Sequence, residues 1–254
     1  MEVKSIYKQI TKRQINGFNY NGFPRSPVAF VTSLASNVSL VSHLQQFESL
    51  QSHSGCVNTV NWSADGNKLV SGSDDTCVCV WEPFQENHLA LKFYSGHRAN
   101  IFSTKFLPFQ NDNLVISCAG DCQVRAFYLH QQEEGMVTPY FVSKHHNERV
   151  KKLAFFNDSS FTFLSASEDC TSLLFDLRTT NRSPLKVIDL AQGNRTDAVE
   201  LTSVAISGNY IAVGGRDPFV RVYDKRICRS ETGDRPAGKD DFVKRFAPEH
   251  IVKA

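Results

Sequence analysis

The sequence lacks a long hydrophobic run. Its most apolar stretch, Pro27–Val41, is short and is interrupted by Thr32, Ser33 and Ser36, whereas a membrane-spanning helix needs about 20 mostly apolar residues. The stretch also lies too far from Met1 to be an ordinary signal peptide. The sequence therefore predicts no membrane span.

Net charge is also small. The chain has 28 basic and 26 acidic residues, a balance that gives no general reason to expect binding to nucleic acid or to a membrane surface. Its seven cysteines are an odd number without metal-ligand spacing, and Cys77 and Cys79 alternate with valines in one expected strand. We interpret them as reduced, packed thiols, so we expect a cytoplasmic or nuclear protein, or one found in both places.

Residue patterns typical of catalytic, metal or phosphate sites are missing. His145 and His146 are adjacent, but no further His or Cys lies at ligand spacing from them. Gly214 and Gly215 precede a strand-like run rather than a helix that begins with Lys and Ser or Thr, so they do not form a phosphate loop. No nucleophile–base pair stands out. We therefore expect no enzymatic activity, no metal and no cofactor.

What the sequence does contain is a repeat. Residues 71–81, 117–127, 165–175 and 213–223 each read as strand, tight turn and strand, with an Asp six residues before an aromatic residue. The four pairs are Asp75 and Trp81, Asp121 and Phe127, Asp169 and Phe175, and Asp217 and Tyr223. Successive Asp residues lie 46, 48 and 48 positions apart. A fixed period in this range is typical of a repeat architecture.

The repeated Asp is expected to organise hydrogen bonds within each repeat. A short acidic side chain accepts from the unpaired amides of a tight turn, and it can also hold a histidine. In the first repeat we predict a network of His53, Thr59, Asp75 and Trp81, with each hydrogen bond contributing ~1 kcal/mol.

Later repeats supply fewer members of this network. The second offers His97, Ser103 and Asp121, and the third offers His146 and Asp169. Both have Phe where the first repeat has Trp, so they lack the indole donor. The fourth has Asp217 but no histidine at the matching place, so the network is predicted to be fullest in the first repeat.

These motifs resemble the WD-repeat family of β-propellers over roughly residues 50–226. The likeness is carried by the Asp turns, by Gly96-His97 and by the endings Phe175-Asp176 and Tyr223-Asp224. The resemblance implies an all-β fold of four radially arranged antiparallel sheets, or blades. Because four such blades do not ordinarily close into a ring, we expect the chain to be part of a longer propeller.

The blades are expected to occupy residues 44–226, between two different ends. Residues 1–43 are predicted to hold a short amphipathic helix, with Ile6 and Ile10 in its apolar stripe, and a linker. This segment is basic and poor in acidic residues, which is also typical of a mitochondrial presequence; we favour a docked or partner-binding helix. Residues 227–254 are polar and show no clear period, so we expect a weakly ordered tail.

Repeats three and four share a strand ending that the first two lack. Asp176 and Arg178 in one, and Asp224 and Arg226 in the other, form the pattern aromatic-Asp-x-Arg. Two guanidinium groups at the same place on adjacent blades would offer planar donor forks to a partner's carboxylates or carbonyls. Alternatively, each Arg pairs only with its own Asp at the surface, an interaction of little energetic consequence.

The pattern is similar to the motif by which WD-repeat substrate receptors dock on the damage-specific DNA-binding adaptor of cullin-4 RING ubiquitin ligases, although Phe or Tyr replaces Trp here. The runs 96–103 and 217–224 also resemble proteins that combine WD and tetratricopeptide repeats. The resemblance implies a non-enzymatic substrate receptor that contacts the adaptor through both Asp–Arg pairs and through the helix with Ile6 and Ile10. The alternative is a generic WD-repeat scaffold, for example chromatin- or corepressor-associated, without a ligase role.

Overall fold

The computed structural model describes residues 38–130, 132–133, 136–156, 158–179, 183–191, 198–228 and 236–248. The chain divides into two compact units, residues 1–49 and 50–254. In the first unit the structure describes one helical turn, α3 (Val38–Val41). The helix predicted around Ile6 and Ile10 lies outside the described residues. No helix in the described part of the chain is long and apolar enough to cross a membrane.

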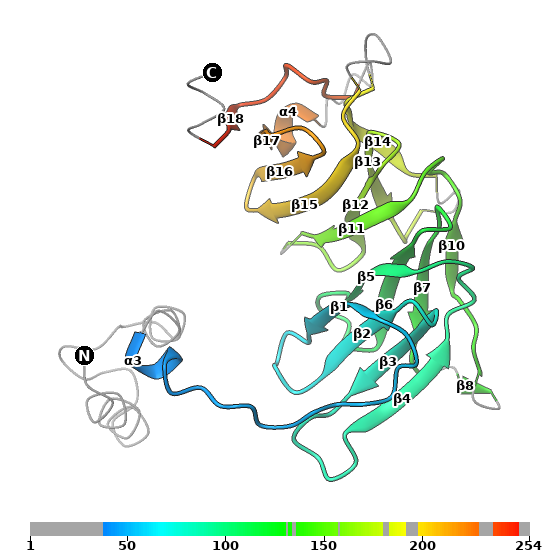
Figure 1. Ribbon diagram of the computed structural model, residues 1–254. Coiled ribbons are helices and arrows are strands. Elements are labelled where there is room, and N and C mark those ends of the chain that lie inside the picture. The colour runs from blue at the N-terminus through cyan, green and yellow to red at the C-terminus, as the bar shows by residue number, and fades with distance from the viewer. Residues whose placement is uncertain are drawn as a thin grey trace. The chain divides into compact units, whose positions relative to one another are not determined.

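The second unit contains four four-stranded antiparallel sheets, which we call blades 1 to 4 (Figure 1). Blade 1 consists of β1 (Val57–Trp62), β2 (Leu69–Ser73), β3 (Cys77–Trp81) and β4 (Leu89–Tyr94). Blade 2 consists of β5 (Ile101–Phe106), β6 (Leu114–Ala119), β7 (Val124–Tyr128) and β10 (Phe141–Ser143), with a small hairpin of β8 (Gln132–Glu133) and β9 (Met136–Val137) before its last strand.

Blade 3 consists of β11 (Val150–Phe155), β12 (Thr162–Ser167), β13 (Thr171–Asp176) and β14 (Leu185–Asp189). Blade 4 consists of β15 (Leu201–Ser207), β16 (Tyr210–Gly215), β17 (Val220–Asp224) and β18 (Lys244–Phe246), with the short helix α4 (Lys225–Cys228) after β17. The predicted all-β fold of four antiparallel sheets is confirmed. The fourth blade extends beyond residue 226, because the segment predicted to be a weakly ordered tail supplies β18, its outer strand.

Burial explains why these segments form strands. All six residues of β6 and of β12 are buried, as expected for middle strands whose two faces both pack against neighbouring elements. Aromatic contacts join adjacent blades: the rings of Phe93 and Phe127 lie 5.1 Å apart across blades 1 and 2, and those of Phe141 and Phe175 lie 6.0 Å apart across blades 2 and 3. The core therefore lies between the blades.

The inner strand of every blade has the same irregular register. The pairing shifts between Val57 and Thr59 in β1, and at the corresponding places in β5, β11 and β15. This shared bulge aligns the four inner strands residue by residue. It places Thr59, Ser103, Lys152 and Ser203 at one equivalent position, and Asn61, Lys105, Ala154 and Ala205 at another.

The tight turns are alike in three blades and different in the fourth. The residue after the repeated Asp has a positive φ in blades 1 to 3, namely 61° at Thr76, 65° at Cys122 and 70° at Cys170. This backbone conformation is uncommon for residues other than glycine. In blade 4 the corresponding residue is Pro218, whose ring restricts φ to about −65°. The fourth Asp turn therefore does not share the backbone conformation of the other three.

Candidate protein-interaction site

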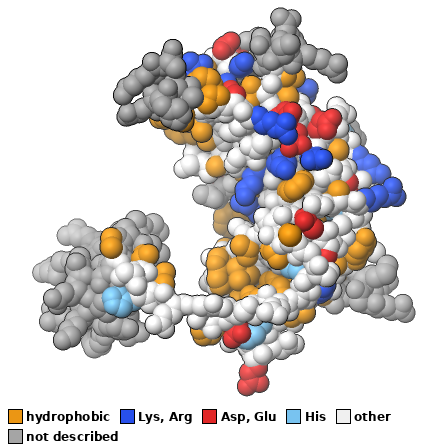
Figure 2. Space-filling view, viewed as in Figure 1, with side chains coloured by type: hydrophobic (Ala, Val, Ile, Leu, Met, Phe, Trp, Pro, Cys, Tyr) orange, Lys and Arg blue, Asp and Glu red, His pale blue; other side chains and the backbone are white. Residues whose placement is uncertain are grey.

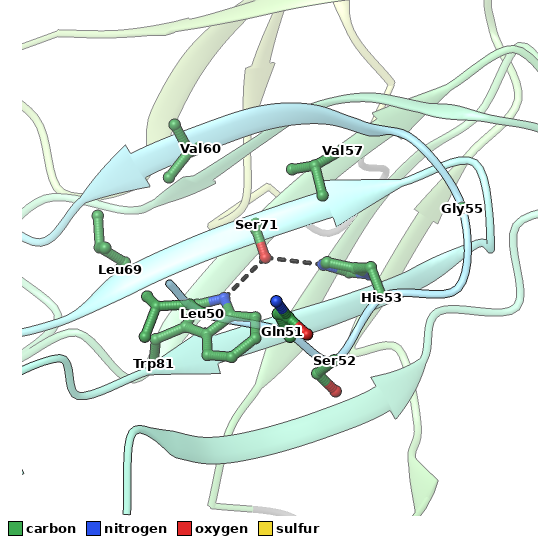
Figure 3. A pocket seen from close by; sticks show the side chains of 10 residues that line it. All are labelled: Leu50, Gln51, Ser52, His53, Gly55, Val57, Val60, Leu69, Ser71 and Trp81. Atoms are coloured by element: carbon green, nitrogen blue, oxygen red, sulfur yellow. Dashed lines mark hydrogen bonds between the residues drawn. The ribbon is translucent and has the colours of Figure 1, made fainter. Parts of the chain in front are cut away.

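The repeated Asp of blade 1 lies in a continuous chain of hydrogen bonds. His53 Nδ1 lies 3.0 Å from Asp75 Oδ2, and His53 Nε2 lies 2.8 Å from Ser71 Oγ. The indole nitrogen of Trp81 donates to the same Ser71 oxygen at 2.8 Å, as Figure 3 shows. If Ser71 donates its hydroxyl proton to His53 Nε2 and His53 Nδ1–H donates to Asp75, every group has a partner.

Blades 2 and 3 repeat the arrangement without the indole. His97 Nδ1 lies 3.0 Å from Asp121 Oδ1, and its Nε2 lies 2.8 Å from Ser117 Oγ. In blade 3, His146 Nδ1 lies 2.8 Å from Asp169 Oδ2, and its Nε2 lies 2.6 Å from the hydroxyl of Ser165. Burial lowers the pKa of His97, which favours the neutral imidazole that this bonding pattern requires.

The hydroxyl groups in these networks are not the ones predicted. Thr59 Oγ1 instead accepts a hydrogen bond from the Thr104 amide of the next blade at 3.2 Å. Ser103 Oγ is buried and has no hydrogen-bond partner among the described residues. The physical reason is that Thr59 and Ser103 lie on inner strands, whereas the network hydroxyls lie on the middle strands β2, β6 and β12.

The missed serines had a signal in the sequence. Ser71, Ser117 and Ser165 are the first residues of the first three repeat copies, and each comes four residues before the Asp. The fourth copy begins with Val213. A hydroxyl that recurs with the Asp and the His, and disappears with the His, belongs to the same network.

The Asp carboxylates also hold the turn backbone. Asp75 accepts from the amides of Ser54 at 2.9 Å and Cys77 at 3.0 Å. Burial alone raises the pKa of Asp169, but hydrogen bonds, first from His146 and then from Thr171, outweigh burial and hold the pKa at about 2. These carboxylates therefore remain ionised in the folded protein at neutral pH.

Blade 4 stabilises its Asp in another way. Asp217 pairs with both terminal nitrogens of Arg221, whose side chain is 2% exposed. Thus an arginine from β17 takes the place of the histidine. The histidines and most of the Asp side chains are buried within their own blades, so all four arrangements hold the sheets together.

A cavity of about 360 Å³ lies beside the blade 1 network. Its walls include Leu50, His53, Val60 and Trp81, and Figure 3 shows these side chains around it. Within the described residues, no group of three or more His, Cys, Asp or Glu side chains is placed to hold a metal ion. The cavity thus combines apolar walls with side chains of the blade 1 network.

The two predicted Asp–Arg pairs have the same geometry, and the arginine of each is exposed. Asp176 Oδ1 accepts from the Arg178 amide and from Arg178 Nε, both at 3.0 Å, while Nη2 donates to Oδ2 at 2.7 Å. In blade 4, Asp224 Oδ1 accepts from the Arg226 amide at 2.9 Å and from Nε at 3.0 Å. The arginine side chains are 62% and 67% exposed. Each carboxylate therefore fixes a guanidinium at the surface.

Both pairs lie at the same end of their blades. Asp176 pairs with Thr162 at the start of β12, and Asp224 pairs with Tyr210 at the start of β16. At this end Lys225 of α4 forms an ion pair with Asp158 of blade 3 at 2.9 Å. Arg178 and Arg226 therefore lie at the same end of adjacent blades. The ion pair between Lys225 and Asp158 links the two blades at this end.

Comparison with known proteins agrees with the repeat and with the blades. The WD domain, G-beta repeat family (WD40) matches residues 44–82 and 138–176. The chain belongs to the WD-repeat family. The two matched segments include the Asp turns of blades 1 and 3.

Several curated proteins are similar to most of the chain. Human WD and tetratricopeptide repeats protein 1 is 41% identical over 205 residues, which cover 78% of this chain and 29% of that protein. Human DDB1- and CUL4-associated factor 6 is 34% identical over 221 residues, covering 83% and 25%. WD repeat protein iqw1 of Schizosaccharomyces pombe is 33% identical over 210 residues, covering 79% and 25%. The chain spans less than a third of the length of these relatives.

Proposed function

We propose that this WD-repeat chain is a non-enzymatic interaction scaffold that acts as part of a substrate receptor for a cullin-4 RING ubiquitin ligase. The observation that carries the proposal is the duplicated, surface-exposed Asp–Arg pair on blades 3 and 4. Support comes from a relative whose name, DDB1- and CUL4-associated factor 6, states its association with that machinery. In this proposal the chain positions a substrate protein for ubiquitination and performs no chemistry itself.

The adaptor contact would use the planar face and the free donors of each guanidinium. Arg178 and Arg226 already hold one carboxylate each, so each arginine is oriented before a partner arrives. An oriented side chain loses less conformational entropy on binding than a mobile one. We further propose that the segment with Ile6 and Ile10 forms a second contact with the adaptor, and that the protein acts in the cytoplasm, the nucleus or both.

A generic WD-repeat scaffold is the second candidate. The observation that favours it is that Asp176 and Asp224 already satisfy part of the donor fork of each arginine. Ion pairs with an exposed arginine contribute little to stability, and they occur on surfaces that bind nothing. The two candidates differ in whether removal of the guanidinium groups affects binding to the adaptor.

The test uses a full-length variant that carries both Arg178→Ala and Arg226→Ala. The measurement is how much of the damage-specific DNA-binding adaptor co-purifies with this variant and with the wild-type protein. Loss of a partly desolvated charged contact typically costs ~2–5 kcal/mol, so co-purification should fall strongly. Arg178→Lys and Arg226→Lys should restore only part of the capture, because an ammonium does not reproduce the planar fork.

Arg216→Ala is the matched control. Arg216 is 64% exposed, forms an ion pair with Glu200, and follows Gly215 at the opposite end of blade 4. This variant should capture the adaptor like wild type. If the double alanine variant keeps wild-type capture and unchanged strand content by circular dichroism, the ligase proposal fails and the generic scaffold is favoured.

A further inference from the structure

The inner strands enclose a cavity of about 490 Å³ that the blade networks do not use. Residues from β1, β5, β11 and β15, together with the turns after β1 and β5, line it. Trp62, Phe155 and Ile206 provide apolar walls, while Lys105, Lys152 and Ser203 provide polar groups. All four blades therefore contribute to one hollow.

Lys105 and Lys152 have no acidic partner in the described part of the chain. Neither forms an ion pair or a hydrogen bond there, and Lys105 Nζ lies 5.9 Å from the centre of the Phe155 ring. Burial, and then the charge of Lys152, lower the pKa of Lys105. Two lysines thus face one cavity, and an anion between them would favour the charged form of Lys105.

The carboxylate of Asp112 lines this cavity but forms no ion pair with Lys105 or Lys152 in the described part of the chain. Asp112 lines the cavity from the turn after β5. Its pKa is raised by burial and by the neighbouring Asp65, and the cation that acts against this shift is Lys68. The positive charge of Lys105 and Lys152 therefore remains without compensation from the described residues.

The repeat itself does not require these lysines. The position of Lys152 is occupied by Thr59, Ser103 and Ser203 in the other three blades, and the position of Lys105 by Asn61, Ala154 and Ala205. Neutral residues at the same places build the same inner strand with the same bulge. The lysines are thus additions to the blade pattern that both happen to face the cavity.

We propose that this cavity binds an acidic peptide segment of a partner protein, with a carboxylate between Lys105 and Lys152 and an apolar side chain against Trp62 and Phe155. Charge complementarity selects the acidic group, and the size and apolar walls select a peptide over a small free anion. The proposal holds whether or not the partner at the Asp–Arg pairs belongs to a ligase.

The position of the cavity allows a bound partner to reach it. The cavity extends to Ala64 and Pro108, in the connections that follow the inner strands β1 and β5. The equivalent connections in blades 3 and 4 are those beside the Asp–Arg pairs. A protein bound at this end of the blades would therefore lie close to the residues that line the cavity.

Trp62 supplies an intrinsic signal for the test. The chain has two tryptophans; Trp62 lines this cavity and is 49% exposed, whereas Trp81 is 4% exposed and hydrogen-bonded inside blade 1. The probe is a short peptide of alternating glutamate and leucine, titrated into the 254-residue chain at a concentration where sedimentation velocity shows the monomer, while tryptophan emission is recorded. The comparison peptide has glutamine in place of every glutamate.

The acidic peptide should shift the Trp62 emission, and the glutamine peptide should bind about tenfold more weakly or worse. Lys105→Met with Lys152→Met should abolish this preference while keeping the aliphatic stems that pack in the cavity. Lys144→Met, which removes an exposed lysine outside the cavity, should leave the preference unchanged. Circular dichroism checks the fold of each variant.

Three results would overturn the proposal. Equal binding of the two peptides to the wild-type chain would show that charge does not select the ligand, and this comparison needs no variant to fold. A folded double methionine variant that still prefers the acidic peptide would place the peptide elsewhere. Displacement of the peptide by inorganic phosphate at the same concentration would show that the site takes a free anion instead.

Discussion

The carboxylate of Asp75 is the acceptor at the centre of the blade 1 network. It bonds His53 and accepts from the amides of Ser54 and Cys77. Replacing Asp75 with Ala leaves these donors, of which His53 and Cys77 are partly buried, without their acceptor, which should lower the free energy of unfolding by ~1–3 kcal/mol. Urea unfolding monitored by circular dichroism measures this change.

Asp74→Ala is the control for that experiment. Asp74 is adjacent in sequence, but its carboxylate accepts from the exposed side-chain amide of Asn58. Because surface contacts of this kind contribute little, the free energy of unfolding should change by less than about 0.5 kcal/mol. Equal midpoints for the two variants would mean that the buried network does not stabilise blade 1.

The corresponding network in blade 3 should make stability depend on pH. The pKa of Asp169 is about 2 in the folded protein, below its ordinary value of 3.8. A lowered pKa in the folded state contributes stability that is complete above the unfolded value and is lost as pH falls toward the folded value. The contribution of Asp169 should therefore disappear between about pH 4 and pH 2.

Asp169→Asn isolates this contribution. Asn keeps an acceptor for the turn but does not titrate, so the variant should be less stable than wild type at about pH 5 and should approach wild type at about pH 2.5. Chemical denaturation at the two pH values measures the gap. A gap of constant size across this range would mean that ionisation of Asp169 is not what stabilises the blade.

The side chains of these networks were only partly predictable from sequence. His53, His97 and His146 each meet the Asp that spacing assigned to them, because the repeat period fixes both positions. The prediction of Thr59 and Ser103 as the third partners is wrong, since spacing alone does not tell which strand turns a side chain toward the histidine. The exchange of histidine for Arg221 in blade 4 had no signal in the repeat pattern at all.

At the scale of elements, two equivalent glycines show how neighbouring blades control packing. Gly72 of β2 pairs with Thr59, and Gly214 of β16 pairs with Ser203, the matching inner-strand residue. A Cβ atom on Gly72 would lie 2.7 Å from side-chain carbons of both Ile101 and Thr104 in blade 2, whereas one on Gly214 would meet nothing within 4 Å. Packing against blade 2 thus requires glycine at position 72, whereas position 214 of blade 4 has room for a larger side chain.

Gly72→Ala should therefore destabilise the chain by ~1–3 kcal/mol through overpacking between blades 1 and 2. Gly214→Ala should be neutral or slightly stabilising, because alanine reduces the entropy of the unfolded chain and fits the strand backbone. Thermal unfolding of both variants tests the contrast. Similar losses in both would show that the cost arises within a blade and not between blades.

Elements were the most predictable level of this structure. Strict strand–turn–strand repeats located the middle strands of all four blades, since period and turn chemistry agree there. The outer strand β18 was not found, because Lys244, Arg245 and Phe246 are exposed and show no apolar alternation. An exposed outer strand that pairs through its backbone with β17 leaves almost no trace in the sequence.

At the scale of the whole molecule, blade 1 leaves an apolar face open. Val57, Val60 and Trp62 of β1 are 56%, 63% and 49% exposed, and Figure 2 shows hydrophobic side chains gathered over this part of the molecule. The equivalent residues of blade 2, Ile101, Thr104 and Phe106, are at most 6% exposed, because blade 1 covers them. The open face of β1 thus has the composition of an interface between blades.

The isolated 254-residue chain should associate with itself through this face. Contiguous exposed apolar surface of this kind promotes association in water, so sedimentation velocity should show species larger than a monomer that increase with concentration. Val60→Lys places a charge in the centre of the face and should lower the association. Val41→Lys adds the same charge at a residue of α3 that is 51% exposed, and should leave the association unchanged. A chain that remains monomeric at every concentration tested, with a cooperative unfolding transition, would show that four blades with an open face are stable on their own.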